Sequence, residues 1–180
     1  KSVVEGYYHI WLKKINSSVN KASPGKRFAQ LQFGIMCFEG LTDVTNLKSK
    51  LKEIENSDNL RKWRIRSQNM LYQEKEMQKM LRDAFSNQNL AWWQKEITDL
   101  KIAASNSQDK MMAAMSNRLL GFIGIACYSF AKQLVGENAP ESDKVLQIYQ
   151  IAEPNKSEAW FLSAVYKSNN KQPEKALSDF

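Results

Sequence analysis

The sequence is poor in the residues that most catalytic and metal sites require. It holds one histidine, His9, and two cysteines in 180 residues. A histidine-based zinc site of the H-E-x-x-H kind needs two histidines, and the lack of C-x-x-C excludes zinc ribbons and thioredoxin-like redox motifs. The phosphate-binding patterns G-x-G-x-x-G and the P-loop are missing as well. We therefore expect no enzymatic activity, no metal and no cofactor, with His9 at the rim of the first helix.

Glycine and proline are also scarce, at 7 and 4 residues. An all-β fold needs many tight turns, which these residues supply, and no segment shows sustained alternation of β-branched residues. The longest apolar stretch without a charge, 119–131, is shorter than the ~20 residues that cross a bilayer. The sequence predicts a soluble all-α protein without a transmembrane segment.

Apolar residues at helical spacing, divided by polar or turn-forming breaks, predict where the helices lie. We expect a short helix that starts from an N-cap at Asp43 or Thr45 and extends through Ile54. The other expected helices span 3–19, 27–41, 60–85, 90–104, 108–135, 142–152, 157–168 and 173–180. Breaks at this spacing suggest antiparallel hairpins stacked in sequence, as a bundle or a short right-handed superhelix.

The helix expected at 108–135 is apolar on nearly all sides after Arg118. A helix without a polar face belongs in the interior, so we place it centrally. We expect a single helical domain over 1–180, with a bundle over 1–107 and helical hairpins over 108–180.

Three side chains are candidates for unusual burial. Cys37 and Cys127 each lie in an apolar run, and we interpret both as buried free thiols. A disulfide between them stays open, because the sequence does not give the separation of their Cα atoms. Glu74 lies near an apolar stripe and would then need a partner, which Arg82 or a lysine on another helix could supply.

The net charge is +7, with a pI of about 9.3. This charge favours anionic partners without identifying one. Four basic residues surround Trp63 and Ile65 within 61–66, but on a helix they point in several directions. We interpret them as a solvated face. A basic module that binds nucleic acid or an anionic membrane surface stays as the alternative.

Trp92 and Trp93 are adjacent in the sequence. Neighbouring side chains on a helix diverge by about 100°, so both cannot face the core. Because an exposed tryptophan is a frequent interface anchor, both are candidates for binding a partner.

The C-terminal part, about 120–180, resembles a tetratricopeptide (TPR) repeat, a helix–turn–helix unit of about 34 residues. Trp160 stands at the Trp position and Ala164 at the small position, and Ala176-x3-Phe180 matches the pair on the second helix. Pro154 matches the proline that ends a preceding repeat. Ser163 and Lys167 depart from the Leu and Tyr of the pattern. Upstream, Ile123-Gly124 resembles the Leu-Gly pair, and Cys127 takes the Tyr place.

The resemblance implies a non-catalytic scaffold whose stacked hairpins hold a segment of another protein or a peptide. By position, it implies that Phe161, Val165 and Ser168 line the binding groove. The missing initiator methionine favours an exported, mature bacterial chain, and an excised segment explains it equally well.

Overall fold

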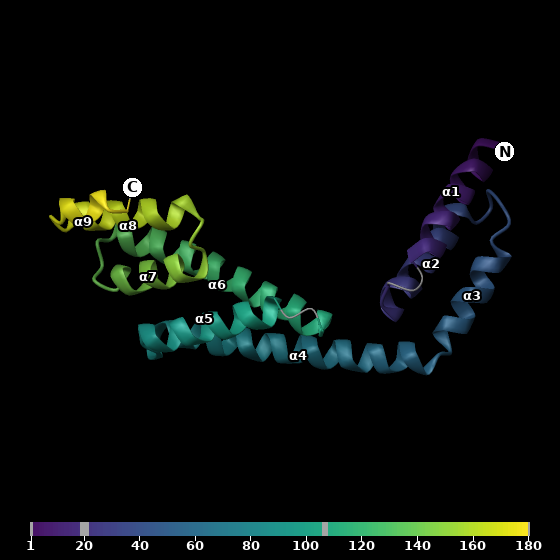
Figure 1. The fold of residues 1–180 in the computed structure, drawn as a ribbon, viewed down its shortest axis with the longest axis horizontal. Coiled ribbons are helices and arrows are strands. Elements are labelled where there is room, and N and C mark those ends of the chain that lie inside the picture. Colours follow the sequence, from purple (N-terminus) through teal and green to yellow (C-terminus); the bar gives the residue numbers. More distant parts are fainter. Residues whose placement is uncertain (1, 19–21, 106–107, 180) are drawn as a thin grey trace. The chain divides into compact units, whose positions relative to one another are not determined.

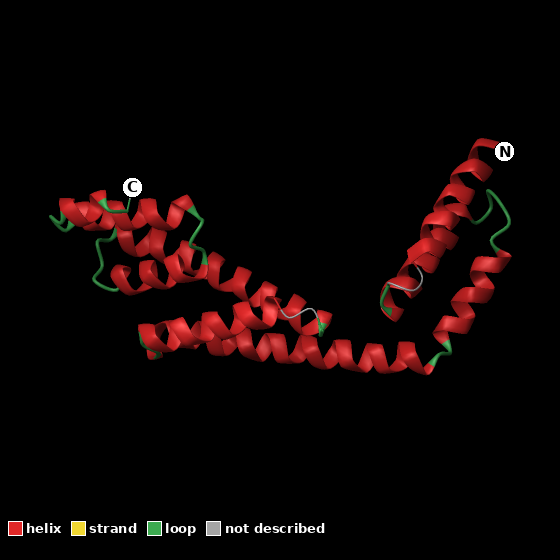
Figure 2. Ribbon diagram, viewed as in Figure 1, coloured by secondary structure: helices red, strands yellow, loops and turns green. Residues whose placement is uncertain are grey.

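The computed structural model describes residues 2–18, 22–105 and 108–179. Over these residues the chain forms nine helices and no strand (Figure 1 and Figure 2). The all-α prediction is therefore confirmed. The chain divides into two compact units, Lys1–Asn69 and Met70–Phe180. This boundary falls inside a helix and does not coincide with the break near residue 107 at which we divided the sequence.

The first unit holds α1 (Ser2–Ser18), α2 (Pro24–Phe38), α3 (Thr45–Glu55) and the start of α4 (Asp58–Asn87). Its core is small, because only a few apolar side chains are fully enclosed. The buried members are Tyr8, Leu31, Val44 and Leu47, with Trp11, Leu12, Ile35, Phe38, Leu51 and Ile54 packed against them.

Two glycines of α2 let aromatic rings approach its backbone. A Cβ atom at Gly34 would lie 2.0 Å from the ring of Trp11, and one at Gly25 would lie 2.2 Å from the ring of Trp63. Such distances are too short for any side chain. The glycines therefore allow α1 and α4 to pack their tryptophans directly on α2.

The second unit holds the rest of α4 together with α5 (Leu90–Ser105), α6 (Lys110–Gly136), α7 (Ser142–Ala152), α8 (Ser157–Asn169) and α9 (Pro173–Leu177). α6 contacts α5, α7 and α8, and α9 packs on α8. The main core draws on all of these helices except α9. Its buried members are Leu81, Ala84, Trp93, Ile97, Leu100, Met115, Leu119, Ile123, Cys127, Ile148, Tyr149, Ala152 and Ala159.

One face of α6 is buried in the core of the second unit, and another face is exposed to solvent. Leu119, Ile123 and Cys127 are fully buried, whereas Ile125 is 71% and Tyr128 40% exposed. The central position expected for this helix agrees with its contacts to α5, α7 and α8, but one of its apolar faces stays exposed. α6 is also the one described helix that is long and apolar enough to cross a membrane by length and composition, and the core helix of a folded protein passes the same test.

Polar side chains define the starts of four helices. The side chains of Ser23, Ser57, Asn89 and Asp109 accept hydrogen bonds from backbone N–H groups in the first turns of α2, α4, α5 and α6. These bonds satisfy donors that a helix start leaves unpaired. α2 begins at Pro24 rather than near 27, since proline suits the first helical position.

Two lysines satisfy carbonyl groups at the far ends of helices in the second unit. The Nζ atom of Lys144, on α7, donates to the carbonyl of Phe85 near the end of α4, at 2.8 Å. The Nζ atom of Lys101, on α5, donates to the carbonyl of Ile151 at the end of α7, at 2.7 Å. A cation is favourable at a helix C-terminus because unpaired carbonyls gather there.

Candidate functional site

The exposed side of α6 borders a hollow of about 350 Å³, called here the α6–α8 groove. Gly121, Gly124, Ile125 and Tyr128 of α6 form one wall. The rest of the lining is Tyr149 of α7, Glu153 and Lys156 of the following loop, and Glu158 of α8. The groove therefore combines an apolar and aromatic wall with two carboxylates and one ammonium group.

The absence of a side chain at Gly124 shapes this groove. A Cβ atom there would lie 2.9 Å from Oε1 of Glu153. The glycine therefore lets the side chain of Glu153 lie directly against α6. Burial raises the pKa of Tyr149, and the nearby carboxylates of Glu158 and Glu153 raise it further. The phenol stays neutral and the groove carries a negative bias.

The residues of the best-matching repeat unit lie in and beside α8, whereas Ile123, Gly124 and Cys127 of the upstream match lie on α6. Nε1 of Trp160 donates a hydrogen bond to the carbonyl of Pro154, at 2.9 Å, and its ring packs against the main core. Ala164 and Ala176 are both buried, and their small size allows α8 and α9 to pack closely. Phe180 lies outside the described residues.

The three groove residues implied by the resemblance differ in exposure. Phe161 is 56% exposed, and Ser168 is exposed as well. Val165 is half-buried and packs against a second apolar cluster formed by Ala131, Val135, Val145 and Leu146. None of the three is among the described residues that line the α6–α8 groove.

Known protein families, curated proteins and solved structures show no match to this chain. The function of the chain is therefore inferred from the geometry of the described residues.

The side chains of Trp92 and Trp93 point in different directions, as their adjacent positions on a helix require. Trp93 is 0% exposed, so it belongs to the core, and the expectation that it reaches a partner has no support in its placement. Trp92 is half-buried, with its ring perpendicular to that of Trp93 at 5.2 Å. It borders an open hollow of about 420 Å³ beside the end of α4. Of the two, Trp92 alone is accessible.

Glu74 is buried and forms an ion pair, as expected, but with a different partner. Its carboxylate accepts hydrogen bonds from Nε and Nη2 of Arg118 on α6, the shortest at 2.6 Å. These bonds lower the pKa of Glu74, against the opposing effect of burial. The prediction of Arg82 or a lysine was wrong. The arrangement is a structural link between α4 and α6.

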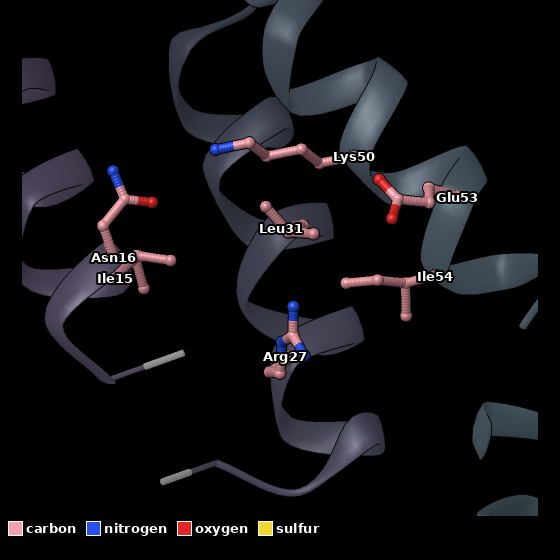
Figure 3. A pocket seen from close by; sticks show the side chains of 7 residues that line it. All are labelled: Ile15, Asn16, Arg27, Leu31, Lys50, Glu53 and Ile54. Atoms are coloured by element: carbon pink, nitrogen blue, oxygen red, sulfur yellow. The ribbon is translucent and has the colours of Figure 1, made fainter. Parts of the chain in front are cut away.

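The first unit has its own hollow of about 280 Å³ between α1, α2 and α3. Figure 3 shows its polar groups arranged around Leu31. Arg27 and Lys50 supply two cations, Glu53 one carboxylate and Asn16 one amide. The hollow therefore combines charges of both signs with an apolar floor.

The basic segment 61–66 is partly engaged within the first unit. Arg61 pairs with Asp58 at 3.0 Å, and the guanidinium of Arg64 lies 4.9 Å from the ring centre of Phe28. These contacts engage two of its four cations, although the Arg61–Asp58 pair is exposed to solvent. They give the alternative of nucleic-acid or membrane binding no specific support.

The cysteines are both free, but they differ in exposure. Cys127 is buried, as predicted, and burial raises the pKa of its thiol. Cys37 is exposed, so its predicted burial was wrong, because no described helix covers that side of α2. His9 is exposed on α1. Within 2–18, 22–105 and 108–179, no three His, Cys, Asp or Glu residues form a group that could hold a metal ion.

Proposed function

We propose that this chain is a non-catalytic scaffold that binds an extended segment of a partner protein through TPR-like helices at its C-terminus. One observation carries the proposal. Ile125 and Tyr128 project from the core helix α6 into solvent and border the α6–α8 groove. Exposed apolar side chains that gather at a concave surface are typical of protein-binding sites.

The repeat pattern supports the same surface. Ile125 follows Gly124 as Val165 follows Ala164, and Gly121 precedes Gly124 by the same interval at which Phe161 precedes Ala164. By the resemblance, Gly124 and Ala164 take the same small position, which makes these pairs equivalent on α6 and α8. In the resembled family, such first-helix positions line the ligand groove.

The side chains that line the α6–α8 groove indicate the composition of the partner segment. Tyr128 and Ile125 suit apolar side chains, while Glu153 and Glu158 exceed the single ammonium of Lys156 by one negative charge. An extended peptide that alternates apolar and basic residues satisfies both features.

The test begins with a display library of random peptides, selected against the whole chain. The affinity of the selected peptides is then compared for wild type, Ile125→Asp and Ile102→Asp. The two isoleucines are matched, since Ile102 of α5 is 65% exposed and lies outside the groove. We expect Ile125→Asp to weaken binding at least tenfold, a typical effect for an interface anchor, and Ile102→Asp to leave it unchanged. Equal affinities for the three proteins would refute the proposal.

A further inference from the structure

A further concave surface of the second unit combines features that the α6–α8 groove lacks. It lies between α4, α5 and α6 and encloses about 540 Å³. We call it the acidic methionine groove, after the residues that line it. The described lining is Tyr72, Gln73, Glu76 and Met77 of α4; Glu96, Asp99, Leu100 and Ala103 of α5; and Met112, Met115 and Ser116 of α6.

The charge of this groove is opposite to that of the chain. The whole sequence carries +7, yet every charged residue in the described lining is a carboxylate, namely Glu76, Glu96 and Asp99. Asp99 is paired with Lys95 at 3.1 Å on the exposed surface of α5. The nearby cation Arg118 is engaged by the buried carboxylate of Glu74. Glu76 and Glu96 are the other two carboxylates of the described lining.

The apolar part of the lining is adaptable. Met77, Met112 and Met115 contribute unbranched, polarisable side chains, which fit irregular apolar surfaces. Tyr72 is 67% exposed and Met112 37% exposed, so the groove presents an aromatic ring and a thioether to solvent. A methionine-lined hollow between helices is the kind of surface on which an amphipathic helix lays its apolar face.

We propose that the acidic methionine groove is the docking site for a basic amphipathic helix of a partner protein. The apolar face of that helix would rest on the methionines. Its lysine or arginine side chains would face Glu76 and Glu96 at the rim. Charge complementarity selects this occupant, since an acidic or neutral helix of the same shape would gain no attraction from the carboxylates.

The test uses the whole chain and synthetic peptides of about 18 residues, or five helical turns. The first peptide is an amphipathic helix of leucine and lysine, the second replaces each lysine by glutamate, and the third is a scrambled leucine–lysine sequence. Binding is followed by NMR of chain labelled with ¹³C at its seven methionine methyl groups. Met36 of the first unit is 71% exposed and serves as an internal control for unspecific contact.

We expect the amphipathic basic peptide to shift the methyl signals of Met77, Met112 and Met115 and to leave that of Met36 in place. The double variant Glu76→Lys with Glu96→Lys should bind it at least tenfold more weakly, because two attractive rim charges become repulsive. Glu174→Lys, a reversal at an exposed carboxylate outside the groove, is the matched control and should bind as wild type.

Three results would overturn the proposal. The first is equal binding of the scrambled or the acidic peptide. The second is an equal shift of the Met36 signal. The third is self-association of the chain that saturates these methionines and excludes the peptide, because the occupant would then be a second copy. Ile125→Asp should leave peptide binding unchanged, so the outcome is independent of the α6–α8 groove.

Discussion

Replacement of Arg118 by alanine should destabilise the second unit through the carboxylate that it leaves behind. Glu74 is 7% exposed, so without the guanidinium it would be a buried charge with no partner. Removal of one partner from a fully buried pair costs about 3–5 kcal/mol. The side chain of Arg118 is 51% exposed, so water can replace part of its contribution. We expect a loss of about 2 kcal/mol at neutral pH, close to that of a charge-assisted hydrogen bond.

The loss of stability caused by Arg118→Ala should depend on pH in a defined direction. Hydrogen bonds from Arg118 lower the pKa of Glu74 in the folded protein, relative to about 4.3 in an unfolded chain. The stability contributed by the pair is therefore fully present above that value and disappears as the pH falls through the lower folded pKa. In Arg118→Ala, burial alone acts on Glu74 and raises its pKa. The deficit of the variant should therefore shrink as the carboxyl becomes protonated.

Hydrogen exchange of the α6 amides in the whole chain measures this effect, because the two units need not unfold together. Arg82→Ala is the control, since Arg82 is exposed, its guanidinium lies 6.0 Å from the ring centre of Phe122, and it should contribute at most about 1 kcal/mol. The double variant Glu74→Leu with Arg118→Leu should recover most of the loss. An Arg118→Ala deficit no larger than that of Arg82→Ala, or one that does not change on acidification, would refute the reasoning.

Two further predictions concern glycine packing and thiol access. Gly34→Ala should destabilise the first unit by about 1–3 kcal/mol, because its Cβ would overlap the ring of Trp11. Gly6→Ala on α1, where a Cβ meets nothing within 4 Å, should raise stability by up to about 1 kcal/mol; thermal melts that rank the two changes the other way would contradict the packing. A thiol reagent should modify Cys37 within the folded chain and reach Cys127 only on unfolding, so equal labelling of both by peptide mass analysis would show that α6 is not enclosed.

Much of the secondary structure could be predicted from periodicity and breaks. α5, α7 and α8 begin at the predicted residues, since polar or proline-containing breaks separate strongly periodic segments. The start of α2 was placed too late because Ser23-Pro24 was interpreted as an interruption, whereas a capping serine followed by proline is also a helix start. If Ser23-Pro24 is taken as a capping serine followed by proline, the sequence predicts the observed start of α2 at Pro24.

The contacts between helices could not be predicted in the same way. Helical spacing shows that Glu74 faces an apolar stripe, but it does not show which helix covers that stripe. The partner is Arg118, because α6 is the helix that lies against Glu74 of α4. Likewise, the composition of α6 predicts a central position for this helix, but it does not show that Ile125 and Tyr128 stay exposed. The candidate grooves depend on these uncovered faces, which a single sequence does not disclose.

The lysines that reach helix ends should give the lysines of the second unit different reactivities toward an acylating reagent. The ammonium groups of Lys101 and Lys144 are held against the carbonyls of Ile151 and Phe85, whereas a lysine such as Lys95 extends from the surface with 78% of its side chain exposed. An amine-acylating reagent needs the free, deprotonated amine, so these two positions should be acylated late and surface lysines early. The order of acylation would report whether this unit is intact in an unpurified extract, without any engineered probe.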